Sequence, residues 1–163
     1  MSGEPQLRVL FICTGNTCRS PMAAAALTDE LGSDAARVVV ESAGISAQDG
    51  QPASTDTREL LHAQGLDVSA HRARRVNASL LRDADFVIVM DPLHRQALEA
   101  QGVPRERVQI LSEFPAPGEP GLPVSDPYGA SKEAYEECWR RIRLHVRRLA
   151  PVVREALDAR NPS

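Results

Sequence analysis

The sequence has few cysteines, almost no lysine and no long apolar run. Three of its 163 residues are cysteine, and Lys132 is its only lysine. Three cysteines are too few for a disulfide scaffold, and Cys13 and Cys18 share one short segment, which favours thiol chemistry in a reducing compartment. No apolar run approaches the roughly 20 residues that a membrane-spanning helix needs.

The charge balance gives no reason to expect a polyanionic partner. Lys and Arg total 19 against 22 Asp and Glu, a formal net charge of −3 with a pI near 5.8. We therefore expect no nucleic-acid or membrane partner. The first residues show no basic stretch followed by an apolar one, so we expect a cytoplasmic protein. The length predicts one domain over residues 1–163, a monomer or weak dimer, with flexible ends at 1–6 and 158–163.

Short apolar runs alternate with segments typical of helices. The strands are expected at 7–12, 38–40, 85–90 and 107–111, and the helices at 21–32, 54–64, 91–100 and from about 131 onward. This alternation predicts an α/β fold, a three-layer open sheet of about four parallel strands with helices on both faces, flavodoxin-like or Rossmann-like. Ligands of such sheets bind at the carboxyl ends of the strands, so the loop after the first strand is the expected site.

A proline-rich loop precedes the final helix. Residues 113–127 hold five prolines and two glycines, which neither helix nor sheet tolerates, and long irregular loops are often functional. The final helix carries an apolar stripe that is expected to pack on the sheet. Its arginines are expected to form a solvated face rather than an anion-binding patch: Arg140, Arg141, Arg143, Arg147 and Arg148.

The loop after the first strand has the composition of a phosphate cradle. It reads Cys13-Thr14-Gly15-Asn16-Thr17-Cys18-Arg19-Ser20-Pro21. Backbone N–H groups of a strand-to-helix loop bind oxyanions, and the start of a helix adds partial positive charge. Arg19 is suited to hold two phosphate oxygens, and Cys13 is expected to be a thiolate nucleophile in the same positive field.

A cysteine that attacks phosphorus needs an acid to protonate the leaving atom. The proline-rich loop supplies Asp126, held by Pro127, with Tyr128 beside it as a wall for the substrate side chain. An Asp-Pro pair alone is usually a turn. Together with the cysteine loop, however, it completes a mechanism.

At this point the sequence resembles the low molecular weight protein tyrosine phosphatases along nearly its whole length. The motifs are Cys-x5-Arg-Ser, Ser42-Ala43-Gly44, Ser69-x-His71, Met90-Asp91 and Asp126-Pro127-Tyr128. The resemblance implies a phosphocysteine intermediate on Cys13, Arg19 as ligand of the phosphate, and Asp126 as general acid and then base. It also implies that Asn16 adopts a strained left-handed conformation held by Ser20, Ser42 and His71. Cys18 is implied as the partner of a reversible disulfide that protects Cys13 from over-oxidation.

Two residues separate this chain from members that act on phosphotyrosine. Those members carry a bulky aliphatic residue at the position of Thr17 and a second aromatic at that of Gly129, and residues 45–85 here contain no aromatic residue. The loop resembles the protein arginine phosphatase branch, whose threonine selects phosphoarginine. Phosphoarginine in proteins is therefore the favoured substrate, with phosphotyrosine as the alternative.

Other functions fit less well. A thioredoxin-coupled arsenate reductase needs two further cysteines, which the chain between Cys18 and Cys138 lacks, and Cys138 is expected in the core. A non-catalytic phosphate-binding module would need neither nucleophile nor acid, and a disulfide oxidoreductase usually has Cys-x-x-Cys. The other histidines show no metal-ligand spacing, so we expect no metal and no cofactor.

Overall fold

The computed structural model describes residues 7–115, 117–119 and 121–160. The expected flexible ends at 1–6 and 161–163 lie outside the described residues. Residues 158–160, expected in the flexible C-terminal end, are instead helical, because the last helix continues to Arg160. No helix among the described residues is long and apolar enough to span a membrane.

Four strands alternate with five α-helices and three short 3₁₀ segments in the described chain. The strands are β1 Leu7–Cys13, β2 Val38–Gly44, β3 Phe86–Val89 and β4 Val108–Ile110. The helices are α1 Arg19–Leu31, α2 Thr55–Ala63, α3 Ala78–Asp83, α4 Pro92–Ala100 and α5 Lys132–Arg160. The 3₁₀ segments are η1 Gly32–Arg37, η2 Arg105–Arg107 and η3 Leu111–Glu113.

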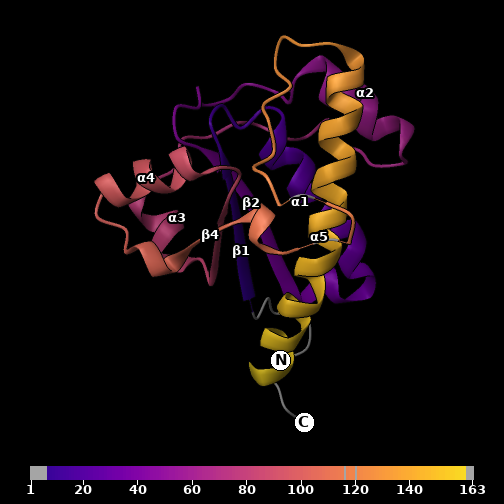
Figure 1. The fold of residues 1–163 in the computed structure, drawn as a ribbon. Coiled ribbons are helices and arrows are strands. Elements are labelled where there is room, and N and C mark those ends of the chain that lie inside the picture. Colours follow the sequence, from indigo (N-terminus) through magenta and orange to yellow (C-terminus); the bar gives the residue numbers. More distant parts are fainter. Residues whose placement is uncertain (1–6, 116, 120, 161–163) are drawn as a thin grey trace.

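The strands form one parallel sheet with the order β2-β1-β3-β4. Helices α1 and α5 pack together on one face, while α3 and α4 cover the other (Figure 1). This confirms the predicted three-layer α/β fold. The chain runs from β1 to β2 on one side and then crosses to β3 on the other side of β1, so the carboxyl end of β1 is the topological switch point of the sheet, where such folds bind ligands.

From Val9 to Cys13 both faces of β1 are buried, as the apolar sequence of this stretch predicts, whereas Arg8 is exposed. Val9 and Phe11 contribute to the core under α1 and α5, whereas Leu10 and Ile12 contribute to the core on the side of α3 and α4. Each of these side chains is at most 1% exposed, and full burial of such a side chain stabilises a fold by roughly 1.5–3 kcal/mol. The strand that carries Cys13 is therefore fixed on both sides.

The sheet differs from the sequence prediction mainly at β2. This strand was expected over 38–40 but extends to Gly44, because Ser42, Ala43 and Gly44 pair with Phe11, Ile12 and Cys13. The extension brings the Ser42-Ala43-Gly44 segment beside the loop that follows β1. Helix α3, whose six residues are too few for a clear apolar period, was not predicted.

Candidate active site

The loop between β1 and α1 curves around the carboxyl end of the sheet. Cys13 is the last residue of β1 and Arg19 the first of α1, and both are 3% exposed. Gly44 on the neighbouring strand permits the close approach of this loop, because a Cβ at that position would lie 2.6 Å from the carbonyl oxygen of Thr14. The start of α1 therefore faces a curved backbone segment, the arrangement that binds oxyanions.

The sulfur of Cys13 has two polar neighbours. The backbone N–H of Asn16 donates to Cys13 Sγ at 3.3 Å, and Ser20 Oγ lies 3.0 Å from the same sulfur. Since Asn16 Nδ2 donates to Ser20 Oγ at 2.8 Å, the Ser20 hydroxyl can donate its own proton to the sulfur, with the carbonyl oxygen of Ala43 at 3.5 Å as the other acceptor. The N–H of Asn16 and the hydroxyl of Ser20 are therefore both placed to donate to Cys13 Sγ.

Asn16 is the structural centre of the loop. It is fully buried and has φ of 59°, the only positive φ of a non-glycine residue in the described chain. Its Nδ2 also donates to Ser42 Oγ at 2.9 Å, and its Oδ1 accepts from the backbone N–H of Arg74 at 3.0 Å. The side chain thus ties the loop to β2 and to the segment before α3.

His71 holds the backbone of the same residue. Its Nε2 lies 2.7 Å from the carbonyl oxygen of Asn16, which only accepts, so Nε2 carries the proton. Burial lowers the pKa of His71, which favours this neutral donor form at neutral pH. Ser20, Ser42 and His71, expected to support Asn16, all contact it.

The guanidinium of Arg19 connects the loop to two other segments. Its Nη1 donates to the carbonyl oxygen of Val124 at 3.0 Å and to Asp91 Oδ2 at 3.3 Å. Its Nη2 donates to Thr14 Oγ1 at 3.3 Å and lies 3.7 Å from Asp126 Oδ2. The arginine is thus oriented beside the loop before any ligand binds.

Asp126 and Tyr128 reach the site from the proline-rich loop. The carboxylate of Asp126 is about half exposed, and its Oδ1 accepts from the backbone N–H of Tyr128 at 3.1 Å. The side chain of Tyr128 is 69% exposed. An ionisable carboxyl group and an aromatic ring therefore stand at the entrance, facing the loop.

These groups line one cavity of about 800 Å³. Its walls include the predicted residues Cys13, Thr14, Gly15, Thr17, Cys18, Arg19, Asp126 and Tyr128. Asn16, which was also expected to bind phosphate, is fully buried within the loop and does not line the cavity. The structure therefore brings the sequence-predicted nucleophile, arginine and acid to one cavity.

Cys18 faces a small polar network on its far side. Its Sγ lies 3.4 Å from both Ser54 Oγ and Tyr135 Oη. Ser54, the N-cap of α2, also donates its backbone N–H to the carbonyl oxygen of Thr17 at 3.0 Å. Burial, followed by the contact with Cys18, raises the pKa of Tyr135, so its hydroxyl stays protonated. Cys13 and Cys18 are both free thiols.

The sequence analysis gave no role at the site to Asp91 or His94, although Met90-Asp91 is one of the motifs of the resemblance. Asp91 follows β3 and caps α4, its Oδ1 accepting from the N–H of Leu93 at 2.8 Å, while its other oxygen contacts Arg19. The Asp-Pro sequence indicates only a helix start, so it gives no sign that Asp91 also contacts Arg19. Its position at the carboxyl end of a strand is the signal that could have revealed it.

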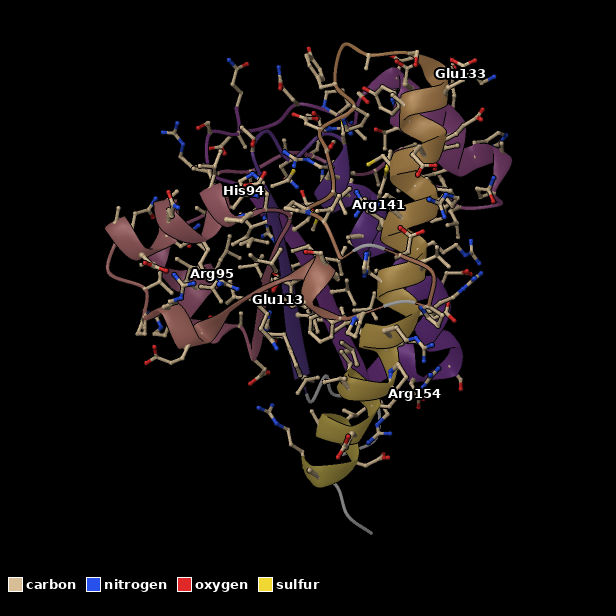
Figure 2. The ribbon with its side chains drawn as sticks, in the orientation of Figure 1. His94, Arg95, Glu113, Glu133, Arg141 and Arg154 are labelled. Atoms are coloured by element: carbon tan, nitrogen blue, oxygen red, sulfur yellow. The ribbon has the colours of Figure 1, made fainter. Side chains whose placement is uncertain are left out.

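His94 lies at the start of α4 beside the site (Figure 2). Its Nδ1 accepts from the N–H of Met90 at 3.3 Å, so its Nε2 donates to Thr14 Oγ1 at 2.9 Å. Burial lowers the pKa of His94 to about 4, so the ring is neutral at pH 7. Thr14 Oγ1 accepts from both His94 and Arg19, which leaves its own proton free for a ligand in the cavity.

No group of three or more His, Cys, Asp or Glu side chains in the described part of the chain could hold a metal ion. Cys138, expected in the core, is buried on α5. The site thus brings a cysteine, an arginine and a carboxyl group together around the loop between β1 and α1.

Comparisons with known proteins agree with this site. The family model described as low molecular weight phosphotyrosine protein phosphatase matches residues 8–161. The low molecular weight protein-tyrosine-phosphatase of Streptomyces coelicolor is 35% identical over 163 residues, covering 94% of this chain and 97% of that protein. The protein-arginine-phosphatase of Geobacillus stearothermophilus is 33% identical over 144 residues, covering 88% and 93%.

A solved structure shows the same fold. The YwlE arginine phosphatase in a Cys-to-Ser mutant form with a phosphorylated active-site serine superposes with a TM-score of 0.82 and 31% identity. The match covers 91% of this chain and 96% of that one. Fold, sequence and site therefore point to one family.

Proposed function

The chain belongs to the low molecular weight phosphotyrosine protein phosphatase family of cysteine-dependent protein phosphatases, and we propose that it hydrolyses phosphoarginine in proteins through an intermediate on Cys13. The observation that carries the mechanism is one cavity lined by Cys13, Arg19 and Asp126. Phosphotyrosine is the alternative substrate.

Binding of the phosphoryl group uses the loop and Arg19. The backbone N–H groups that follow Cys13 and the start of α1 supply partial positive charge for its oxygens. Arg19 and the free proton of Thr14 add donors beside the loop. These donors also stabilise the charge that builds on the equatorial oxygens as the bond to the leaving group breaks.

In the first chemical step the Cys13 thiolate attacks phosphorus. An S–P bond forms while the P–N bond of phosphoarginine, or the P–O bond of phosphotyrosine, breaks. The electron pair of the broken bond stays on the leaving nitrogen or oxygen, which takes a proton from the carboxyl group of Asp126. The half-exposed position of Asp126 at the entrance suits this role, because the leaving group departs toward solvent.

In the second step water replaces the leaving group. The carboxylate of Asp126, which has just lost its proton, takes one from water as the oxygen attacks phosphorus and the S–P bond breaks. Inorganic phosphate leaves and the thiolate of Cys13 returns. The phosphorylated active-site serine of the YwlE mutant supports a covalent route of this kind.

The cavity wall beyond the loop favours phosphoarginine. Between residues 45 and 85 the wall has no aromatic side chain, and its long or charged side chains are those of Gln48, Gln51, Asp56 and Arg58. The amide groups of Gln48 and Gln51 and the carboxylate of Asp56 can accept hydrogen bonds from a guanidinium, whereas the wall offers no ring for a phenyl group to pack on. Thr17 lines the same wall, and its compact hydroxyl-bearing side chain stands where an aliphatic one would pack on a ring.

The substrate is tested by measuring kcat/KM on matched phosphoarginine and phosphotyrosine peptides through release of inorganic phosphate. We expect the wild type to prefer phosphoarginine, and Thr17→Ile to shift the ratio toward phosphotyrosine. A wild-type preference for phosphotyrosine would overturn the phosphoarginine assignment. Cys13→Ser gives the background, and cleavage of neither peptide above that background would favour a phosphate-binding module instead.

A further inference from the structure

The segment that carries Asp126 has few backbone N–H groups with which to stabilise its own conformation. We define the acid loop as residues 121–128. Pro123 and Pro127 have no backbone N–H, so they cannot donate the hydrogen bonds that stabilise a loop. Val124 is its buried anchor at 1% exposed, whereas Leu122 is 59% exposed. Other parts of the chain must therefore fix the position of the acid loop.

Arginine side chains bind three consecutive carbonyl groups of this loop. Arg141 on α5 donates from Nη2 to the carbonyl oxygen of Leu122 and from Nη1 to that of Pro123 at 3.0 Å. Arg19 donates to that of Val124 at 3.0 Å. Only Ser125 separates this bound backbone from Asp126, and the ring of Pro127 restricts the backbone on its other side.

The guanidinium of Arg141 is itself held by a carboxylate. Its Nε lies 3.4 Å from Glu119 Oε2, and Arg140 Nη1 lies 2.7 Å from Glu119 Oε1. The side chains of Glu119 and Arg141 are only 6% and 13% exposed. Arg140 is held in turn by Glu137, one turn earlier on α5, at 2.6 and 2.9 Å.

This arrangement corrects the expectation of a solvated arginine face on α5 at Arg141, whereas Arg140, Arg147 and Arg148 are exposed as expected. Arg141 lies between the helix and the proline-rich segment (Figure 2), with its three nitrogen atoms all engaged. Helical periodicity shows that Arg141 points away from the main apolar stripe. It does not show that a distant loop folds over it.

We propose that Arg141 is a positioning residue for the general acid, fixing the acid loop so that the Asp126 carboxylate faces the leaving group. The inference rests on the proposed role of Asp126. Arg141 does not line the cavity, so it acts through the backbone at Leu122 and Pro123 and not on the substrate. A displacement of about 1 Å in a reacting group can cost on the order of a hundredfold in rate.

The test compares leaving groups of different basicity. Phenyl phosphate releases a phenolate whose conjugate acid has a pKa of about 10, as for tyrosine, and needs an acid. The leaving group of p-nitrophenyl phosphate is far less basic and needs little help. For Arg141→Met we expect kcat/KM to fall about tenfold more on phenyl phosphate than on p-nitrophenyl phosphate.

Two further variants separate the inference from the proposed mechanism. In Asp126→Asn the loss of kcat/KM on phenyl phosphate is expected to exceed the loss on p-nitrophenyl phosphate by a still larger factor, which we call the asymmetry. Adding Arg141→Met to Asp126→Asn is expected to leave this asymmetry unchanged. If Asp126→Asn lost activity equally on both substrates, the general-acid role would fail and the inference with it. If Asp126→Asn showed the asymmetry and Arg141→Met did not, the general-acid role of Asp126 would stand and only the positioning role of Arg141 would be overturned.

Control variants address folding and charge. Arg147→Met removes an arginine of the same helix that pairs with Glu30 of α1, and it is expected to leave both rates unchanged. Glu119→Gln keeps the size of the side chain but weakens its hold on Arg141, so a smaller asymmetry of the same sign is expected. If Arg141→Met fails to fold, Glu119→Gln decides: equal losses on both substrates would contradict the positioning role.

Discussion

The imidazole of His71 fixes the carbonyl of Asn16, the one non-glycine residue with positive φ in the described chain, at a distance of 2.7 Å. This contact holds the loop that follows Cys13. A strained backbone conformation persists only where its surroundings over-determine it. Here the backbone carbonyl is held by His71 and the side chain by β2, α1 and the segment before α3.

Asn16→Ala is expected to lower both stability and activity. Alanine disfavours the left-handed conformation by about 1–2 kcal/mol, and its methyl group leaves Ser42 and the N–H of Arg74 without their partner. We expect the free energy of unfolding to fall by about 2–4 kcal/mol and kcat/KM by at least about tenfold. Urea denaturation and steady-state kinetics measure the two effects.

Two variants show which part of this loss belongs to the site. Asn16→Gly accepts the positive φ and is expected to recover about 1 kcal/mol of stability while kcat/KM stays low. Asn77→Ala removes the N-cap of α3 and is expected to cost about 1 kcal/mol without loss of activity. Wild-type kcat/KM in Asn16→Ala would contradict a role for Asn16 in shaping the loop.

Peroxide inactivation tests the predicted protective role of Cys18. Oxidation of the Cys13 thiolate gives a sulfenic acid, which the Cys18 thiol can convert to a disulfide with loss of water. We expect a thiol reductant to restore the peroxide-treated wild type but not Cys18→Ala. Equal recovery of the two proteins would count against the role.

Cys138→Ala is the matched control for this experiment. Burial raises the pKa of the Cys138 thiol to about 12, so it stays protonated near neutral pH and reacts slowly with peroxide. This variant is expected to inactivate and recover like the wild type. If Cys138→Ala also failed to recover, recovery would not depend on Cys18 specifically, and the protective role could not be assigned to Cys18.

Stability is expected to decline with acidity between pH 6.5 and about 4 because of His94. Burial lowers its pKa to about 4 in the folded protein, against about 6.5 in an unfolded chain. Between these values the unfolded state binds a proton that the folded state does not, so the free energy of unfolding falls as pH falls. His71, whose pKa burial also lowers, contributes in the same direction.

His94→Gln is expected to reduce this dependence by about one proton, measured as the slope of unfolding free energy against pH. His62→Gln removes an exposed histidine of α2 and is the matched control. An unchanged slope in His94→Gln would show that another group causes the decline. His94→Gln also removes the imidazole that donates to Thr14 Oγ1, so a fall in kcat/KM at pH 7 is expected for this variant.

The sequence predicted those parts of the site that depend on neighbouring residues. The apolar run of β1 and the Cys-x5-Arg spacing indicated a strand and an anion-binding loop, and Asp126 was found because Asp-Pro lies in a long irregular loop. The contacts of Ser42 and His71 with Asn16 join distant segments and were expected only through the family resemblance. The roles of Asp91, His94 and Arg141 also depend on contacts between distant segments, and neither the local patterns nor the resemblance predicted them. From the neighbouring residues alone, Asp91 is predicted to cap a helix and Arg141 to lie on a solvated helix face.

The most direct test of the mechanism is to trap the phosphoryl group within the first turnover. The enzyme is mixed with a limiting amount of phosphorylated peptide and quenched rapidly, and its peptides are identified by mass spectrometry. We expect one phosphoryl group on the peptide that contains Cys13, decaying as inorganic phosphate appears, and no hydrolysis by Cys13→Ala. Phosphate release at the wild-type rate by Cys13→Ala, or hydrolysis without a phosphorylated Cys13, would contradict the account.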